Sequence, residues 1–182
     1  MRNALLLAAA LLFSAPALAA DYVQAPGSSL VFAGTYQGEV FSGRFPGFRT
    51  TFAFDPDDLA DARLDVVIPL ASATTGNADY DGELRGPTFF DSVKFAQARY
   101  SADTFRALDD GRYAADGTLS LRGVGRPVTL TFTWTPGEQP VLTGRATVNR
   151  LEFGVGSGDW EDTSVIPDAI AISTKVVFQP AE

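Results

Sequence analysis

The amino-acid sequence predicts an all-β protein: a closed antiparallel β-barrel of about eight or nine strands with a short helical insertion. Three observations favour this fold. Apolar and polar residues alternate over several segments, which is typical of antiparallel strands with one face in water. β-Branched and aromatic residues are frequent in those segments. Short turns separate the segments, and a single sheet of so many strands usually curls or closes, which abolishes its edges.

Four segments carry the clearest alternation. They are 48–54, 63–70, 128–134 and 170–178. In the third of these, apolar side chains occupy one face and threonines the other. Weaker strand patterns cover 29–35, 39–45, 100–105, 112–121 and 141–149. Turn signals rich in Gly and Pro separate the strands: Pro46-Gly47, Asp109-Asp110-Gly111, Gly123-Val124-Gly125 and Pro136-Gly137.

The segment 77–93 lacks the strand rhythm and predicts short helical turns. Asn77 is a suitable N-cap, Asp79 lies early, where the helix dipole favours an anion, and Arg85 lies late. Gly86-Pro87 ends the helix. Because this insertion falls between two strands of the barrel, we expect it to act as a lid.

The first nineteen residues have the features of a cleaved secretory signal peptide. Arg2 provides a positive charge, 4–13 form an apolar stretch, and Ala17-Leu18-Ala19 fits the small-x-small cleavage pattern. We therefore expect a signal peptide over 1–19 and a single domain over 20–182 that is exported to the periplasm. The apolar stretch is too short to span a bilayer, and no later segment approaches the length of a transmembrane helix.

The composition excludes many kinds of chemistry. The 182 residues include no His and no Cys, so nucleophile systems based on these residues, His-ligated metals, iron–sulfur clusters and lipid attachment to Cys are excluded. We accordingly expect no metal site and no cofactor. The net charge of −8 disfavours nucleic-acid binding and attachment to anionic membranes through a basic face.

Catalytic motifs are weak, and we assign no catalytic residue. Gly154-Val155-Gly156-Ser157-Gly158 is not followed by Lys or by a helical pattern, so it predicts a barrel-rim loop rather than a phosphate-binding loop. Asp159, Glu161 and Asp162 do not follow the spacing of a calcium-binding EF-hand loop. A carboxylate pair for glycoside hydrolysis stays as an alternative. Its candidate members are Asp79, Asp81, Glu83, Asp91, Glu152 and Asp159.

The aromatic content points to binding. The chain has 14 Phe, 5 Tyr and 2 Trp, and the Phe residues exceed what the strands of a small barrel need for a thin core. As a set, seven aromatic residues could line an apolar cavity of the size that barrels hold. They are Phe41, Phe45, Phe89, Phe90, Phe132, Trp134 and Phe153. Apolar walls without a catalyst favour a binding protein, not an enzyme.

The order of short motifs resembles the YceI-like family of exported polyisoprenoid-binding proteins. The motifs are Val40-Phe41-Ser42-Gly43-Arg44-Phe45, Phe54-Asp55-Pro56, Thr74-Thr75-Gly76-Asn77, Leu84-Arg85-Gly86-Pro87-Thr88-Phe89-Phe90-Asp91, Gly117-Thr118-Leu119-Ser120-Leu121-Arg122-Gly123, Pro127-Val128, Phe153-Gly154-Val155-Gly156, Trp160 and the last strand from Asp168. They cover nearly all of the mature chain in the family's order. One position departs from the pattern: Ser28-Ser29 stands where the family usually has His-Ser.

The resemblance implies a lipocalin-like barrel whose interior holds a long isoprenoid chain, such as a polyprenyl phosphate or a quinone tail, for storage or transport. The seven aromatic residues would hold the chain, and Arg85 is our candidate for binding a polar or anionic head group. Two alternatives stay open: a carboxylate-dependent periplasmic hydrolase, and a ligand-free structural or stress-related barrel. The oligomeric state also stays open, a homodimer included.

Overall fold

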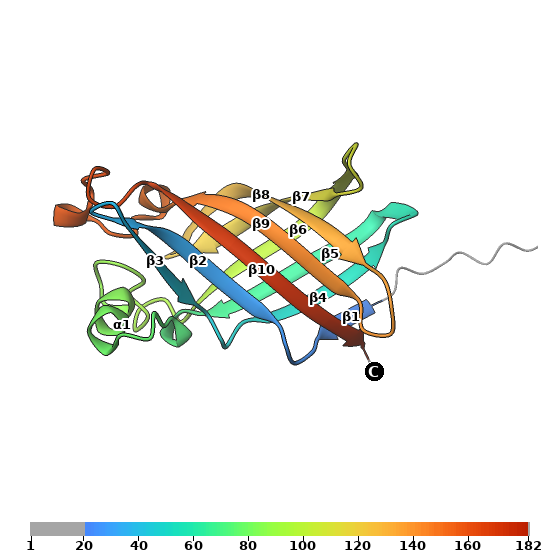
Figure 1. Ribbon diagram of the computed structural model, residues 1–182, viewed down its shortest axis with the longest axis horizontal. Coiled ribbons are helices and arrows are strands. Elements are labelled where there is room, and N and C mark those ends of the chain that lie inside the picture. The colour runs from blue at the N-terminus through green and yellow to red at the C-terminus, as the bar shows by residue number, and fades with distance from the viewer. Residues whose placement is uncertain (1–20, 182) are drawn as a thin grey trace, which may run out of the picture.

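The computed structural model describes residues 21–181, so the expected signal peptide, 1–19, lies outside the described residues. Its main feature is a sheet of ten antiparallel strands (Figure 1). The strands are β1 (Asp21–Gln24), β2 (Ser29–Tyr36), β3 (Glu39–Arg44), β4 (Arg49–Asp55), β5 (Asp58–Pro69), β6 (Gln97–Ala107), β7 (Tyr113–Leu121), β8 (Val124–Thr135), β9 (Val141–Asn149) and β10 (Ala169–Pro180). One α-helix, α1 (Ala78–Arg85), and three short 3₁₀ helices lie between strands. The 3₁₀ helices are η1 (Leu70–Ser72), η2 (Arg150–Phe153) and η3 (Gly158–Trp160).

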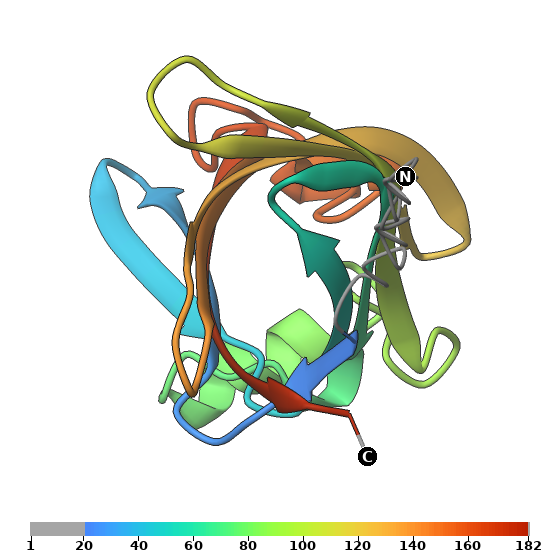
Figure 2. The same cartoon turned by 90° about the vertical axis from the view of Figure 1, so that its right-hand side faces the viewer.

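Eight of the strands close into a barrel, which confirms the predicted fold class. Strands β4 to β10 follow one another in the sheet, and β1 pairs with both β4 and β10. A view along the barrel axis shows the resulting ring (Figure 2). β2 also pairs with β10, on the same edge as β1 but nearer the start of β10. β3 pairs with β2 in a hairpin, and neither strand belongs to the ring of eight.

The helical insertion forms as its sequence predicts. The Asn77 side chain accepts hydrogen bonds from the backbone N–H groups of Asp79 and Tyr80, at 3.0 and 3.4 Å, and so caps α1. The helix ends at Arg85, before Gly86-Pro87. Just before the helix, Thr74 pairs with Arg44 at the end of β3, so the insertion is joined to the β2–β3 hairpin.

The two ends of the barrel differ. α1, the tip of the β2–β3 hairpin and the segment 150–168 lie at one end, which we call the α1 end (Figure 1). The β4–β5, β6–β7 and β8–β9 connections, β1 and the last residues of β10 lie at the opposite end (Figure 1). The insertion is therefore positioned to cover one end of the barrel interior.

Candidate functional site

The α1 end of the barrel interior contains a cavity of about 190 Å³. Most of its wall is made by alternate residues of six neighbouring strands, β5 to β10, because period-two alternation directs the apolar rows inward. These wall residues are Val66, Ile68, Ala98, Tyr100, Leu119, Leu121, Val128, Leu130, Ala146, Val148, Ile170, Ile172 and Thr174. With the exception of Tyr100 and Thr174 they are aliphatic. The wall can therefore hold an apolar group by contact and offers it few hydrogen bonds.

Phenylalanines form the wall of the cavity toward the α1 end. Phe41, Phe45, Phe89 and Phe90, four of the residues we selected from the sequence, line the cavity. Phe32 joins them: its ring centroid lies 5.2 Å from that of Phe45 and 6.2 Å from that of Phe90. Tilted and edge-to-face pairs of this kind add to the stabilisation from burial. The sequence analysis missed Phe32, although it shares one face of β2 with Leu30.

Phe132 and Trp134 do not line the cavity, and the expected lining is corrected at these positions. They lie at the opposite end of the barrel, in what we call the aromatic cluster. Its members are Tyr22, Phe52, Phe54, Phe105, Tyr113, Phe132, Trp134 and Phe178. Phe132 is 1% exposed and packs edge-to-face on Phe54, with ring centroids 5.6 Å apart. The physical reason is that alternation decides which face a residue occupies but not its depth along the barrel axis.

Phe153 is also buried away from the cavity wall. It lies in η2, directly after β9, and is 2% exposed. Its ring is part of the core rather than the lining that we expected.

Arg85 does not reach the cavity wall. Its guanidinium donates to the backbone carbonyl of Ala73, with nitrogen–oxygen distances of 3.3 and 3.4 Å, and lies 3.7 Å from the Asp81 carboxylate. Its side chain is 43% exposed. The residue thus connects the end of α1 to the preceding segment, and the structure places it outside the lining of the cavity.

A buried carboxylate anchors the N-terminal half of α1. Asp81 accepts hydrogen bonds from the Thr74 hydroxyl at 2.6 Å, and from the Thr75 N–H and hydroxyl at 2.6 and 2.8 Å. These bonds, led by the one from Thr74, lower the pKa of Asp81 from its ordinary value, with a further contribution from the charge of Arg85. Asp81, one of the carboxylates weighed for hydrolysis, is therefore held by a structural network.

Arg150 is a cavity residue that the sequence analysis did not select. It is 4% exposed, lies on the cavity wall, and begins η2 at the end of β9. All five of its N–H groups donate to backbone carbonyls within the loop 154–167, which we call the rim loop. The acceptors are Pro167 at 3.1 Å, Val155 at 3.0 Å, Gly156 at 2.9 Å, Trp160 at 2.6 Å and Ile166 at 2.8 Å.

The planar five-donor fork of arginine suits this role, because a lysine would supply three donors at most. Burial lowers the pKa of Arg150, and the nearby charges of Asp168 and Glu161 oppose that effect. The sequence offered one signal: a charged residue at the junction of an alternating strand and a Gly-rich loop.

The rim loop in turn contacts the insertion that follows α1. The Gly156 N–H donates to the Thr88 carbonyl at 2.8 Å, and the ring centroids of Trp160 and Phe89 lie 5.5 Å apart. Val155 and Ile166 of the rim loop line the cavity. The Gly-rich segment is therefore part of the barrel rim, as its sequence predicts.

Ser28, at the position that departs from the family pattern, has a structural role. Its hydroxyl donates to the Ala25 carbonyl at 2.8 Å and accepts from the Val177 N–H at 3.0 Å. It therefore attaches the break between β1 and β2 to β10, and it is not part of the cavity lining.

Two further observations concern residues 21–181. No helix among them is long and apolar enough to cross a membrane. Within the same range, Asp and Glu residues form no group of three or more that could hold a metal ion.

Known proteins resemble this chain in sequence. A model of the YceI-like domain matches residues 22–178. A UPF0312 protein of Vibrio campbellii is 32% identical over 116 residues, which cover 62% of this chain and 61% of that protein. The chain thus spans about three fifths of the length of that relative. A UPF0312 protein of Shewanella denitrificans is 33% identical over 129 residues, which cover 69% of this chain and 68% of that protein.

Solved structures share the barrel. BcnA of Burkholderia cenocepacia superposes with a TM-score of 0.79 at 26% identity, covering 82% of this chain and 95% of that chain. A polyisoprenoid-binding domain from Saccharophagus degradans, implicated in plant cell wall breakdown, superposes with a TM-score of 0.70 at 15% identity. That match covers 91% of this chain and all of the other, and it shows the fold alone. Because the family model matches the chain from Tyr22 to Phe178, the protein belongs to the YceI-like family.

Proposed function

We propose that this protein binds the apolar chain of an isoprenoid-type lipid, polyprenyl or quinone-like, in the barrel cavity, and stores or transports it in the periplasm. One observation carries the proposal: the closed barrel contains a cavity walled by aliphatic and phenylalanine side chains. Each methylene group moved from water into such a site contributes roughly 0.8 kcal/mol. The printed description of the Saccharophagus degradans neighbour as a polyisoprenoid-binding domain supports the ligand class.

The size of the cavity bears on how such a chain would fit. At about 190 Å³ it is a little larger than the ~150 Å³ dry cavity that accommodates benzene. A long isoprenoid therefore places part of its chain in the cavity, and the remainder extends past the rim or displaces rim side chains. Phe89, Phe90 and Leu84 are the lining residues on the insertion, so movement of the insertion would open the way.

The head group of the ligand would lie outside the cavity. Arg150 is the cationic residue on the described cavity wall, and its five N–H groups already have carbonyl acceptors. Arg85, our sequence-based candidate, is occupied by Ala73 and Asp81. The cavity thus selects for the apolar chain.

The family and the polyisoprenoid-binding neighbour favour a binding protein over an enzyme. The cavity lining, as far as residues 21–181 describe it, contains no carboxylate. The candidates for a hydrolytic pair, from Asp79 to Asp159, lie outside that lining. The presence of the cavity also supports a ligand-binding barrel rather than a ligand-free structural one.

Mass spectrometry of an organic extract tests the proposal. The protein is purified from the periplasmic fraction of its native cells, extracted with chloroform and methanol, and compared with an equal amount of an unrelated periplasmic protein. We expect an isoprenoid-type lipid in stoichiometric amount and a mature N-terminus at Ala20. An extract without such lipid, together with no rise in melting temperature when farnesol or a short-chain quinone is added, would contradict the proposal.

A further inference from the structure

The cavity ends abruptly along the barrel axis. On the strands β5, β8 and β10, the lining residue nearest the opposite end is followed by an inward residue that does not line the cavity. Such pairs are Val66 and Leu64 on β5, Leu130 and Phe132 on β8, and Thr174 and Val176 on β10. The cavity therefore has a floor at a single level of the barrel, between the aliphatic wall and the aromatic cluster.

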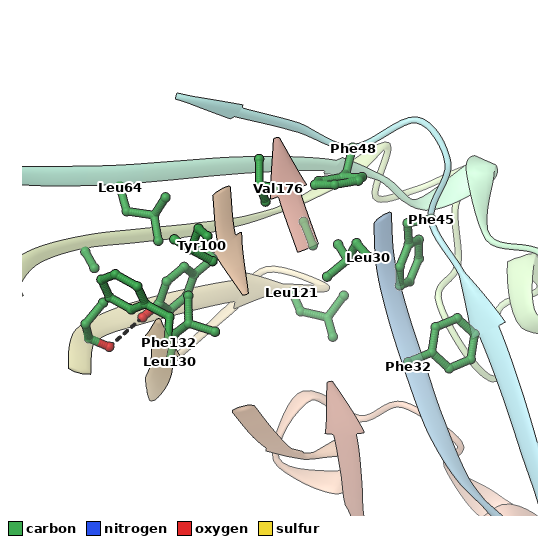
Figure 3. Close-up of a cluster of buried hydrophobic side chains, with 14 of the residues drawn as sticks. Leu30, Phe32, Phe45, Phe48, Leu64, Tyr100, Leu121, Leu130, Phe132 and Val176 are labelled. Carbon is green, nitrogen blue, oxygen red and sulfur yellow. Dashed lines mark hydrogen bonds between the residues drawn. The ribbon is translucent and has the colours of Figure 1, made fainter. Parts of the chain in front are cut away.

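Tyr100 on β6 lies at this level, with the end of its ring over Gly117 of the neighbouring strand β7. It is the aromatic residue that the strands β5 to β10 contribute to the cavity wall, and it is 8% exposed. Its hydroxyl oxygen lies 2.9 and 3.1 Å from the carbonyl oxygens of Ala115 on β7 and Val128 on β8, and its single proton is shared between these two acceptors. Figure 3 shows Tyr100 grouped with Leu130 and Phe132, apart from Phe32 and Phe45.

Two glycines on the wall strands leave room for the side chains at this level. A Cβ atom on Gly117 of β7 would lie 2.7 Å from the hydroxyl oxygen of Tyr100. A Cβ atom on Gly144 of β9 would lie 2.9 Å from Cδ1 of Leu130. Tyr100 and Leu130 thus each occupy space that a larger residue on a nearby strand would take, and their side chains lie inside the barrel.

We propose that Tyr100, with Leu130 beside it, forms the floor of the cavity and sets the length of apolar chain that the protein accepts. This inference deepens the proposed function and rests on it. The anchored hydroxyl holds the ring in place, so an entering chain meets a fixed obstacle. Beyond it, the rings of the aromatic cluster contact one another.

A series of linear alkanols tests this role without an isoprenoid. Dissociation constants of hexanol, octanol, decanol and dodecanol are measured by displacement of the fluorescent probe N-phenyl-1-naphthylamine from the mature protein, and farnesol is measured beside them. In the parent, affinity rises with each methylene until the chain reaches the floor, and then levels off. In Tyr100→Ala we expect the levelling at a chain at least two carbons longer. The longest alkanols then bind about sixteenfold tighter relative to the parent, because each buried methylene contributes roughly a factor of four.

Controls separate the floor from general effects on folding. Tyr100→Phe keeps the ring but loses the hydroxyl that holds it in place, so we expect a length profile between those of the parent and Tyr100→Ala. Tyr113→Ala removes a tyrosine from the aromatic cluster, so it is expected to keep the parent's profile. Should Tyr100→Ala fail to fold, Tyr100→Leu and Leu130→Ala shorten the same floor and replace it in the test.

The outcomes are distinct. An identical length profile in the parent and in the folded floor variants overturns the role of Tyr100, even when farnesol binds. A shifted profile together with no binding of farnesol supports the floor and contradicts the isoprenoid ligand. No binding of any alkanol or of farnesol to the parent overturns both.

Discussion

The α1 end of the barrel interior is walled by aliphatic side chains around a cavity, whereas the opposite end is filled by aromatic rings in mutual contact. The same strands build both halves. On β8, for example, Val128 and Leu130 line the cavity, and Phe132 and Trp134 belong to the aromatic cluster. The comparison indicates that one half provides stability and the other half provides space.

The largest effect is expected from removing a ring of the aromatic cluster. Phe132→Ala should lower the free energy of unfolding by about 3–5 kcal/mol, because Phe132 is 1% exposed and its neighbours cannot fully collapse. Its effect on farnesol affinity should be small once the folded fraction is taken into account. Denaturant unfolding and probe displacement measure the two quantities.

Phe41→Ala is the matched variant on the cavity wall. Phe41 is half-buried, so we expect a smaller loss of stability and a larger loss of lipid affinity. Equal losses of affinity in the two variants would abolish the distinction between the halves.

The second-largest effect is expected at the rim loop, which borders the cavity. Arg150→Met removes five charge-assisted hydrogen bonds and leaves buried carbonyls without donors, so we expect destabilisation of at least ~3 kcal/mol. The destabilisation should be local at first. Amide exchange should therefore accelerate more in 154–167 than in β4, which belongs to the aromatic half. Arg126→Met changes an exposed arginine and should leave both regions unaffected. Uniform acceleration of exchange would show that Arg150 does not act on the rim in particular.

Filling the cavity should change stability in the opposite direction, toward a more stable protein. Ala146→Leu adds apolar atoms to a wall that borders empty space, so we expect a gain in stability of about 0.5–2 kcal/mol and weaker lipid binding. Ala115→Leu makes the same change at a 0% exposed position outside the cavity lining and should cost about 1–3 kcal/mol. Thermal unfolding without ligand compares the two. A loss of stability in Ala146→Leu equal to that in Ala115→Leu would mean that the cavity is not open space in solution.

The smallest effect is a pH dependence confined to the insertion. Because the folded-state pKa of Asp81 is lowered, its contribution to stability is present above the ordinary pKa of ~4 and is lost as the pH falls through the lowered value. We expect α1 to lose protection from amide exchange in that acid range before the barrel strands do. Asp81→Asn should reduce this difference between pH 7 and acid pH. If α1 loses protection from amide exchange at acid pH to the same extent in Asp81→Asn as in the parent, the pH dependence belongs to another group.

Much of the fold follows from alternation along single strands. The rows in 48–54, 63–70, 128–134 and 170–178 predicted β4, β5, β8 and β10, and the capping residues predicted α1. β1 was not predicted, because four residues give too short a pattern. Its place in the barrel depends on pairing with β4 and β10, which lie far along the chain.

The candidate site was less predictable for a physical reason. Alternation assigned Phe132 to the inward face correctly but could not distinguish cavity from filled core, because this depends on the register between strands. Arg85 was selected for its charge, whereas its partners Ala73 and Asp81 are set by the fold of the insertion. Arg150 was overlooked because its partners are backbone carbonyls, which no side-chain motif marks.

Photo-crosslinking shows directly whether the apolar chain of a ligand occupies the cavity half of the barrel. A farnesol analogue with a diazirine at the hydrocarbon end is bound to the mature protein, irradiated, and its attachment sites are mapped by peptide mass spectrometry. We expect crosslinks to cavity residues such as Tyr100, Leu121 and Ile172, and we expect excess unlabelled farnesol to suppress them. Crosslinks confined to the outer surface, or equally frequent at Phe54 and Phe178 of the aromatic cluster, would contradict this expectation.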